Sequence, residues 1–268
     1  MAERSNTHLS VPELKDLAAE VFCDRFADGE WVRTPVYVPR EVELTIYVNQ
    51  QELVTILCTA AKLNYLVIGY LYAEGIISSL DDVASLQISE DGLTADVRLK
   101  NPAYELPLSR KLGCSGSSVF KTHGQKVESD LIVAPTEVII LMKQLLEQME
   151  LYPLSGGVHT SALSDTRILL VVAEDIGRHN TLNKIQGECL INGISTRDRL
   201  MLITGRISSE MLLKAAKMQA PVVVSRHAPT QNAILLAREL GIALVGRVRG
   251  DSLAVFTHPG RLGYAEDR

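Results

Sequence analysis

The sequence predicts an α/β protein whose second half is built around a mostly parallel sheet, and three observations support this class. Hydrophobic residues make up 46% and charged residues 22% of the chain, proportions typical of a globular rather than a disordered protein. The second half contains short, unbroken apolar runs of strand length, such as RILLVVA and PVVVS. Segments with helical spacing of their apolar residues follow these runs. Strands that helices cover on both faces have this pattern, with right-handed crossovers between them.

The first half predicts a smaller α+β unit in which neighbouring strands pair antiparallel. Its first element is an amphipathic helix at 11–27, for which Ser10 and Glu13 have the spacing of a capping box. Alternating apolar residues then predict strands, two of which flank the hairpin turn Asp91-Gly92. The remaining expected elements are strands at 41–48, 53–59, 84–89 and 94–99 and a helix at 60–74.

The second half predicts a regular alternation that begins with an amphipathic helix at 136–149. The elements expected after it are strands at 167–173, 198–204, 221–225, 242–246 and 253–257, with helices near 180–192, 208–218 and 230–240. We therefore divide the chain into an N-terminal extension with a short helix (1–32), an α+β domain (33–125) that ends in a long loop, and an α/β domain (126–268).

Charge and composition indicate which classes of partner and which cellular compartment to expect. The formal net charge of −5 gives no reason to expect a nucleic-acid ligand. The N-terminus lacks the basic start and apolar run of a signal peptide, and no apolar stretch reaches the roughly 20 residues of a membrane span. Four scattered cysteines without a CxxC pair argue against a disulfide framework and a structural zinc site. We therefore expect a cytoplasmic protein that binds neither nucleic acid nor membrane, and no metal site.

The loops after the predicted strands of the second half predict a site for a phosphate-bearing ligand, and we expect this ligand to be a nucleotide. These loops read EDIGRHN, GRISS, RHAPT and RVRGDS, and each contains an arginine. Ligands of open α/β sheets bind at the carboxyl ends of the strands, where helix N-termini and arginine side chains favour phosphate. Ordinary helix caps beside surface arginines are the alternative. The chain has neither a GxGxxG nor a GxxxxGK[ST] motif, which disfavours a Rossmann dinucleotide site and a P-loop.

Acidic residues and histidines near these loops have two interpretations each. Glu174 and Asp175 either reach a ribose or guanine edge or cap the next helix. The histidines either form a metal cluster or serve as hydrogen-bonding partners in a polar cleft, and the absence of metal-ligand spacing favours the second. The histidines concerned are His159, His179, His227 and His258.

A reactive cysteine is predicted in the long loop that joins the two halves. Cys114 lies within RKLGCSGSS, where small residues let the backbone come close to a partner. Nearby Arg110, Lys111 and Lys121 would lower the pKa of the thiol and favour the nucleophilic thiolate. The alternative is an incidental cysteine in a turn. The other three cysteines lie in helix or strand patterns and read as small core residues.

Several motifs together resemble the FdhD/NarQ family. They include GCSGSS, SGGVHTSAL, DIGRHNTLNK, TGRISSEMLLKA, SRHAPT and VFTHPGRL, and the similarity runs from about residue 33 to 262. The resemblance implies an accessory sulfurtransferase, which takes sulfur from a cysteine desulfurase as a persulfide. It passes this sulfur to the molybdenum bis(molybdopterin guanine dinucleotide) cofactor, which formate dehydrogenase needs for activity. It also implies a three-layer α/β/α, cytidine-deaminase-like fold for the second half, and a homodimer.

The resemblance further assigns roles to residues. It implies that Cys114 is the persulfide carrier. The guanine nucleotide end of the cofactor is expected to meet a C-terminal segment, with help from residues of the other strand-end loops. The segment is Arg247, Val248, Arg249, Gly250, Asp251 and Ser252, and the helping residues are Arg178, His179, Arg206, Ser225 and Arg226.

One departure from the family pattern leaves other functions open. Many members have a CxxC pair at the Cys114 loop, whereas this chain has Ser117 at the second position, which excludes a local disulfide. A single-cysteine persulfide relay is the leading hypothesis, and a non-catalytic chaperone that binds the molybdenum cofactor is the alternative. A nucleotide-binding regulator is a third possibility. Zinc deaminase chemistry is excluded, because neither H-x-E nor P-C-x-x-C is present.

Overall fold

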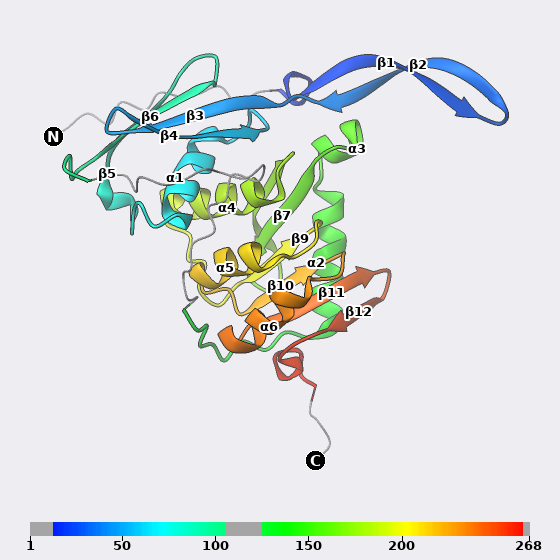
Figure 1. The fold of residues 1–268 in the computed structure, drawn as a ribbon. Helices are drawn as coiled ribbons and strands as arrows, with labels where there is room; N and C mark the ends of the chain where they lie inside the picture. Colours follow the sequence, from blue (N-terminus) through cyan, green and yellow to red (C-terminus); the bar gives the residue numbers. More distant parts are fainter. Residues whose placement is uncertain (1–12, 105–124, 265–268) are drawn as a thin grey trace.

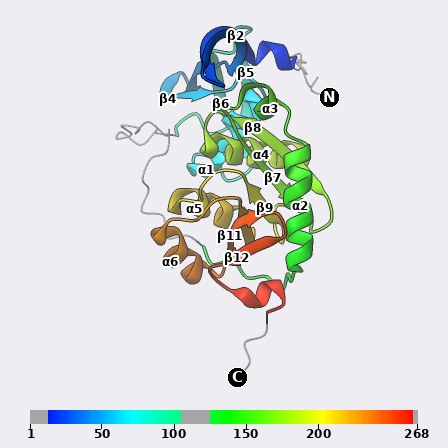
Figure 2. The same cartoon turned by 90° about the vertical axis from the view of Figure 1, so that its right-hand side faces the viewer.

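The computed structural model describes residues 13–104 and 125–264, which form three sheets of two, four and six strands (Figure 1). The two-stranded sheet projects as an arm from one end of the molecule, and the four-stranded sheet continues from its base. The six-stranded sheet and its helices form the larger part of the body, as the turned view of Figure 2 also shows. Within the described residues, no helix is both long and apolar enough to cross a bilayer.

The arm corrects the expectation of a helix at 11–27. The described residues there form a 3-10 turn, η1 (Leu14–Asp16), and a strand, β1 (Ala18–Ala27), that pairs antiparallel with β2 (Glu30–Pro39) along its whole length. The turn between them is Asp28-Gly29, whose positive φ angles of 54° and 87° suit a tight two-residue hairpin. The aromatic and β-branched residues around this turn favour strands over a helix. The expected domain boundary at residues 32 and 33 lies within β2.

The four-stranded sheet confirms the α+β unit predicted for the first half. Its strand order is β4-β3-β6-β5, with β3 (Val42–Val48), β4 (Gln51–Cys58), β5 (Val83–Ile88) and β6 (Thr94–Leu99). Both predicted hairpins are present, and β3 and β6 join them in parallel. Helix α1 (Leu63–Ala73) packs its apolar side chains against this sheet, and a 3-10 turn, η2 (Leu80–Asp82), precedes β5.

The six-stranded sheet has the order β12-β11-β10-β9-β7-β8. Its strands are β7 (His159–Ser164), β8 (Leu169–Asp175), β9 (Leu200–Ile203), β10 (Val222–Ser225), β11 (Ala243–Arg249) and β12 (Ser252–Val255). Strands β8 to β11 run in one direction, while β7 and β12 run against them, so most strands share a direction. Strand β7 was not predicted, and it separates β8 from the parallel trio β9, β10 and β11.

Helices cover both faces of this sheet and confirm the three-layer α/β/α arrangement. Helix α2 (Pro135–Glu147) packs on one face with a short 3-10 turn, η3 (Pro259–Leu262), nearby. Helices α4 (Arg178–Asn192), α5 (Ser209–Lys217) and α6 (Gln231–Leu240) pack on the other. A short helix, α3 (Leu151–Ser155), was not predicted and lies between α2 and β7.

Two glycines let α1 of the first half cross α4 of the second half at very short range. A Cβ atom added at Gly69 would lie 1.8 Å from the backbone oxygen of Asn183, and one added at Gly187 would lie 1.9 Å from that of Tyr65. Only glycine fits where two backbones come this close. The crossing therefore fixes the small sheet against the large one.

Candidate functional site

A cleft of about 350 Å³ opens at the end of the large sheet where β9 and β10 finish. Because β7 runs in the opposite direction, its first residue, His159, lies at the same edge. Thr204 follows β9, and Arg226 and His227 follow β10. The lining residues are Met149, Tyr152, Gly156, Gly157, Val158, His159, Thr204, Arg226 and His227. This is the strand-end position predicted for a ligand, and the segment from α2 through α3 forms its wall.

Positive charge converges on His159 in this cleft. Burial lowers the pKa of His159, and the neighbouring charges of Arg178 and His227 lower it further, with a smaller effect from Arg206. Asp175 acts in the opposite direction. His159 is therefore neutral at pH 7, and cationic side chains from three separate loops lie around it. Such a cluster favours an anionic ligand, and arginine suits phosphate through its paired donors.

Two buried small residues hold the loops after β9 and β10 together. Ser225 Oγ donates a hydrogen bond to the carbonyl oxygen of Gly205 (2.7 Å) and accepts one from the backbone N–H of His227 (2.9 Å). A Cβ atom added at Gly205 would lie 3.1 Å from Nδ1 of His159. Ser225 is fully buried, so it shapes the cleft from below and does not line it.

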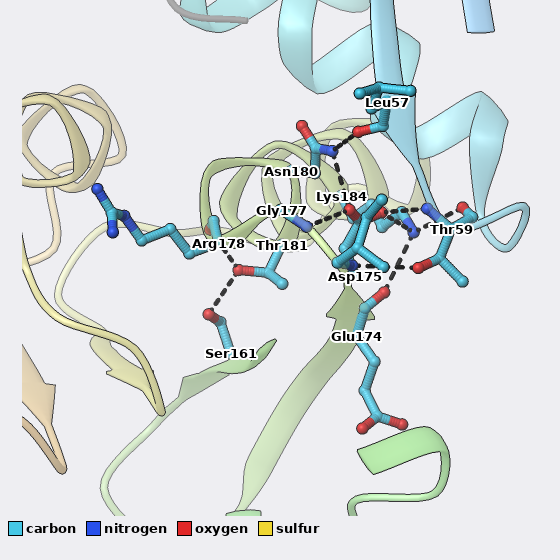
Figure 3. Close-up of polar contacts among 11 residues, drawn as sticks. Leu57, Thr59, Ser161, Glu174, Asp175, Gly177, Arg178, Asn180, Thr181 and Lys184 are labelled. Atoms are coloured by element: carbon cyan, nitrogen blue, oxygen red, sulfur yellow. Dashed lines mark hydrogen bonds and ion pairs between the residues drawn. The ribbon is translucent and has the colours of Figure 1, made fainter. Parts of the chain in front are cut away.

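A buried ion pair fixes the start of α4 and with it Arg178 (Figure 3). Lys184 Nζ lies 2.6 Å from Asp175 Oδ2, and both side chains have no exposed area. Asp175 also accepts hydrogen bonds from the backbone N–H groups of Thr59 (3.1 Å) and Gly177 (2.8 Å). Lys184 donates to the carbonyl oxygens of Thr59 (3.2 Å) and Glu174 (3.1 Å).

This network answers the question about the two acidic residues. Asp175 pairs with Lys184 and accepts a hydrogen bond from the backbone N–H of Gly177 at the start of α4. It therefore caps the helix that follows it, which is one of the two interpretations of the sequence. Glu174 caps α3 by accepting hydrogen bonds from the backbone N–H groups of Leu151 (2.7 Å) and Tyr152 (3.1 Å). Since both carboxylates are committed to the protein, their role is to hold the cleft wall and α4 in place.

The predicted site residues fall into three groups. Arg226 lines the cleft, and Arg178 and Arg206 lie close enough to influence His159. His179 is buried on α4, where its Nε2 lies 3.2 Å from Glu210 Oε2 on α5, and burial lowers its pKa to about 4. Its side chain therefore contacts α5 and not the cleft. Cys114 and Ser117 lie outside the described residues.

The segment from Arg247 to Ser252 forms the end of β11 and the turn into β12. The backbone N–H of Arg247 donates to the carbonyl oxygen of His227 (3.2 Å), which places the start of the segment beside the cleft. Arg247, Arg249, Gly250, Asp251 and Ser252 are exposed, whereas Val248 is buried in the core. Asp251 Oδ1 accepts a hydrogen bond from Lys143 Nζ on α2 (2.8 Å).

Sequence reasoning missed part of the cleft. Thr204 and the wall from Met149 to Val158 were not predicted, and His159 and His227 were expected as hydrogen-bonding partners or, less favoured, as metal ligands. The Gly156-Gly157 pair beside His159 was the available signal. Among the described residues, no three side chains of the His, Cys, Asp or Glu types gather to hold a metal ion.

Comparison with known proteins decides the family. The FdhD/NarQ family profile matches residues 39–263. The chain belongs to the FdhD/NarQ family. A family relative from Bacillus subtilis, named sulfur carrier protein FdhD, is 38% identical over 248 residues, which cover 89% of this chain and 95% of that protein. A protein of the same name from Halalkalibacterium halodurans is 40% identical over 240 residues, covering 84% and 88%.

A solved structure confirms the fold of this FdhD/NarQ member. It is a putative formate dehydrogenase accessory protein from Desulfotalea psychrophila, with a TM-score of 0.78 and 23% sequence identity. The alignment covers 92% of this chain and 99% of that one. The overall fold is therefore that of a known architecture.

Proposed function

We propose that this chain is a sulfur carrier for formate dehydrogenase. It holds sulfur as a persulfide on Cys114 and delivers it to the molybdenum bis(molybdopterin guanine dinucleotide) cofactor. The observation that carries the proposal is the cleft at the ends of β9 and β10, which Arg226 lines together with His159 and His227, and beside which the Arg178 and Arg206 charges lower the pKa of His159. A guanine dinucleotide presents diphosphate groups, which fit such a cluster. The named function of the Bacillus relative agrees with it.

The described cysteines support Cys114 as the carrier. Burial, together with the negative charge of Asp175, raises the pKa of Cys58 to about 12. Burial and the charge of Glu188 raise the pKa of Cys189 to about 12 as well. Because the thiolate is the nucleophile, these two thiols are inert at neutral pH. Cys23 is exposed on the arm, so it is the rival that the experiment must exclude.

The transfer has two balanced steps. The Cys114 thiolate attacks the outer sulfur of the desulfurase persulfide, the S–S bond of the donor breaks, and the donor cysteine leaves as a thiolate. Cys114 then carries the persulfide. On delivery this new S–S bond breaks, Cys114 returns to a thiolate, and the sulfur becomes a sulfide ligand of the metal. The two electrons that this last step requires come from the reduced metal centre of the substrate.

The test compares the wild type with two variants that each lack one cysteine, Cys114→Ala and Cys23→Ala. All three are incubated with a cysteine desulfurase and cysteine. Intact mass spectrometry is expected to find the added sulfur on the wild type and on Cys23→Ala, and to find none on Cys114→Ala. Formate dehydrogenase matured with Cys114→Ala is expected to lose nearly all activity. Full maturation by Cys114→Ala would show that the carrier role is assigned to the wrong residue.

A non-catalytic cofactor chaperone is the second candidate, because the lining of the described cleft contains cations but no cysteine. A chaperone needs only this cleft. It would mature formate dehydrogenase equally well with and without Cys114, provided that guanine nucleotide binding is intact. Nucleotide binding of Cys114→Ala, measured by calorimetry, therefore accompanies the maturation assay and separates the two functions.

A further inference from the structure

The cleft has two chemically different sides. One side is cationic, because the loop after β10 supplies Arg226 and His227. The other side is the wall that leads from α2 through α3 to β7, and the wall residues that line the cleft are uncharged. They are Met149, Tyr152, Gly156, Gly157 and Val158. A ligand that contacts both sides therefore needs an anionic group and an uncharged surface, as is usual for ligand pockets with a few placed polar groups.

Tyr152 is the largest side chain of this wall, and it points away from the protein core. Leu151, the residue before it, is 1% exposed and shares a buried cluster with Leu17 and Val158. Successive residues of a helix point about 100° apart, so Tyr152 does not follow Leu151 into that cluster. Tyr152 is 43% exposed and lines the cleft. Its phenol ring is therefore accessible to a ligand.

Hydrogen bonds hold the backbone of Tyr152 at both of its polar groups. Its N–H donates to Glu174 Oε1 (3.1 Å), and its carbonyl oxygen accepts a hydrogen bond from the backbone N–H of Gly156 (2.7 Å). Glu174 Oε2 also accepts from the backbone N–H groups of Glu150 (3.0 Å) and Leu151 (2.7 Å). A tyrosine on a fixed backbone has only two side-chain torsions left to order, so it binds a ligand at a low cost in conformational entropy.

The start of α3 is closed to the anionic part of a ligand. The Glu174 carboxylate takes the N–H groups of Glu150, Leu151 and Tyr152. The next residue, Pro153, has no N–H to offer. A carboxylate at this position also repels an anion. The anionic group is therefore held on the side of Arg226, and α3 contributes its aromatic ring.

We propose that Tyr152 is the platform on which the base of a purine nucleotide stacks, while the cationic side of the cleft holds the phosphates. The proposal rests on the cofactor cleft of the proposed function and names the residue that selects the base. Gly156 leaves room beside the ring, since an added Cβ there would meet nothing within 4 Å. The cleft of about 350 Å³ lies at the lower end of ligand pockets, which measure roughly 300–1,000 Å³. It accommodates one nucleotide arm of the cofactor rather than the whole bis-dinucleotide.

Stacking predicts a preference among ligands that phosphate binding alone does not produce. A purine covers more of a phenol ring than a pyrimidine does, so GDP and ADP are expected to bind more tightly than UDP. Stacking does not distinguish guanine from adenine, because every base has an aromatic face. Inorganic pyrophosphate has the charges but no base. It is therefore expected to bind more weakly than GDP and to be indifferent to Tyr152.

The first test measures binding of GDP, UDP and inorganic pyrophosphate by calorimetry to the wild type, Tyr152→Ala and Tyr152→Phe. Tyr152→Ala is expected to lose roughly 10-fold or more in GDP affinity, the scale of base–aromatic stacking, and to lose the preference for GDP over UDP. Tyr152→Phe keeps the ring and is expected to bind GDP like the wild type. Pyrophosphate affinity is expected to stay the same in all three. Tyr264→Ala is the matched control, because this tyrosine is 62% exposed but lies after η3 and outside the cleft.

The second test detects the stacked base directly by fluorescence. Trp31 is the single tryptophan of the chain, so Trp31→Phe/Tyr152→Trp moves the tryptophan to the cleft wall. GDP is expected to quench the emission of this variant strongly, and pyrophosphate is expected to leave it unchanged. The wild type is the control, since Trp31 lies on β2 beside the Asp28-Gly29 turn of the arm, which points away from the large sheet in Figure 1. Its emission is expected to ignore both ligands.

The outcomes separate this inference from the proposed function. Equal affinities of the wild type for GDP and pyrophosphate, or GDP binding by Tyr152→Ala at the wild-type level, would overturn the platform and leave the phosphate cleft standing. A parallel loss of GDP and pyrophosphate binding in Tyr152→Ala would also overturn it, because the residue would then only support the cleft. A wild type that binds none of the three ligands would overturn the cofactor cleft and the platform together.

Discussion

At the residue scale, the buried ion pair of Asp175 and Lys184 has a structural role: it holds the DIGRHN motif at the start of α4 in place. Desolvating two charges is costly, and the pair is tolerated because every donor and acceptor is satisfied. The aspartate ties Thr59, which directly follows β4 of the small sheet, to Gly177 at the start of α4. The motif therefore fixes Arg178 relative to both sheets.

Removing one partner of this pair is expected to destabilise the protein strongly. Asp175→Ala leaves Lys184 as an uncompensated buried charge, which costs about 3–5 kcal/mol of unfolding free energy. Asp175→Leu combined with Lys184→Leu removes both charges, and we expect it to recover part of that loss. Urea unfolding followed by circular dichroism measures all three proteins. An equal loss in the double variant would show that packing, rather than charge, holds this junction.

The control for this experiment is an exposed ion pair. Lys143 and Asp251 lie 2.8 Å apart with side-chain exposures of 54% and 87%. Lys143→Ala is expected to leave the free energy of unfolding nearly unchanged, since solvent screens exposed pairs.

At the element scale, the sequence predicted most helices and strands from apolar periodicity, and its failures have identifiable causes. The helix expected at 11–27 is a strand, because β1 takes its conformation from pairing with β2 across Asp28-Gly29. The apolar spacing within 11–27 carries no information about β2, because the partner strand lies outside that segment. Strand β7 was missed since HTSALS contains few strongly apolar residues, although its position between β8 and β9 buries five of its six residues.

At this scale we predict that the close crossing of α1 and α4 does not tolerate a side chain larger than hydrogen at Gly187. Gly187→Ala would place a Cβ atom 1.9 Å from the backbone oxygen of Tyr65, so the helices must separate. We expect the free energy of unfolding to fall by about 1–3 kcal/mol or more, the usual cost of overpacking a core. Thermal unfolding measures it. Gly260→Ala is the control, because an added Cβ there meets nothing within 4 Å. Equal melting temperatures for both variants would show that the two halves pack loosely.

At the scale of the whole molecule, the cleft exists only because the sheet brings distant segments together. The four strand-end loops were predicted as a common ligand edge, and the structure brings Arg226, Arg178 and Arg206 near His159 at that edge. The wall from Met149 to Val158 and the placement of His159 depend on the direction of β7, which periodicity does not encode. The burial of Ser225 and the contact of His179 with α5 likewise follow from packing between layers.

The cationic edge predicts nucleotide binding that involves the phosphates. Calorimetry with GDP, ADP and guanosine is expected to show tighter binding of the diphosphates than of guanosine, and binding that weakens with added salt. Arg226→Ala removes a donor from the cleft, and a charge-assisted hydrogen bond of about 1.5–3 kcal/mol corresponds to roughly 10- to 100-fold in affinity. Arg167→Ala, an exposed arginine before β8 at the opposite edge of the sheet, is expected to change nothing. Equal effects of the two variants would mean that net charge, and not this cleft, attracts the ligand.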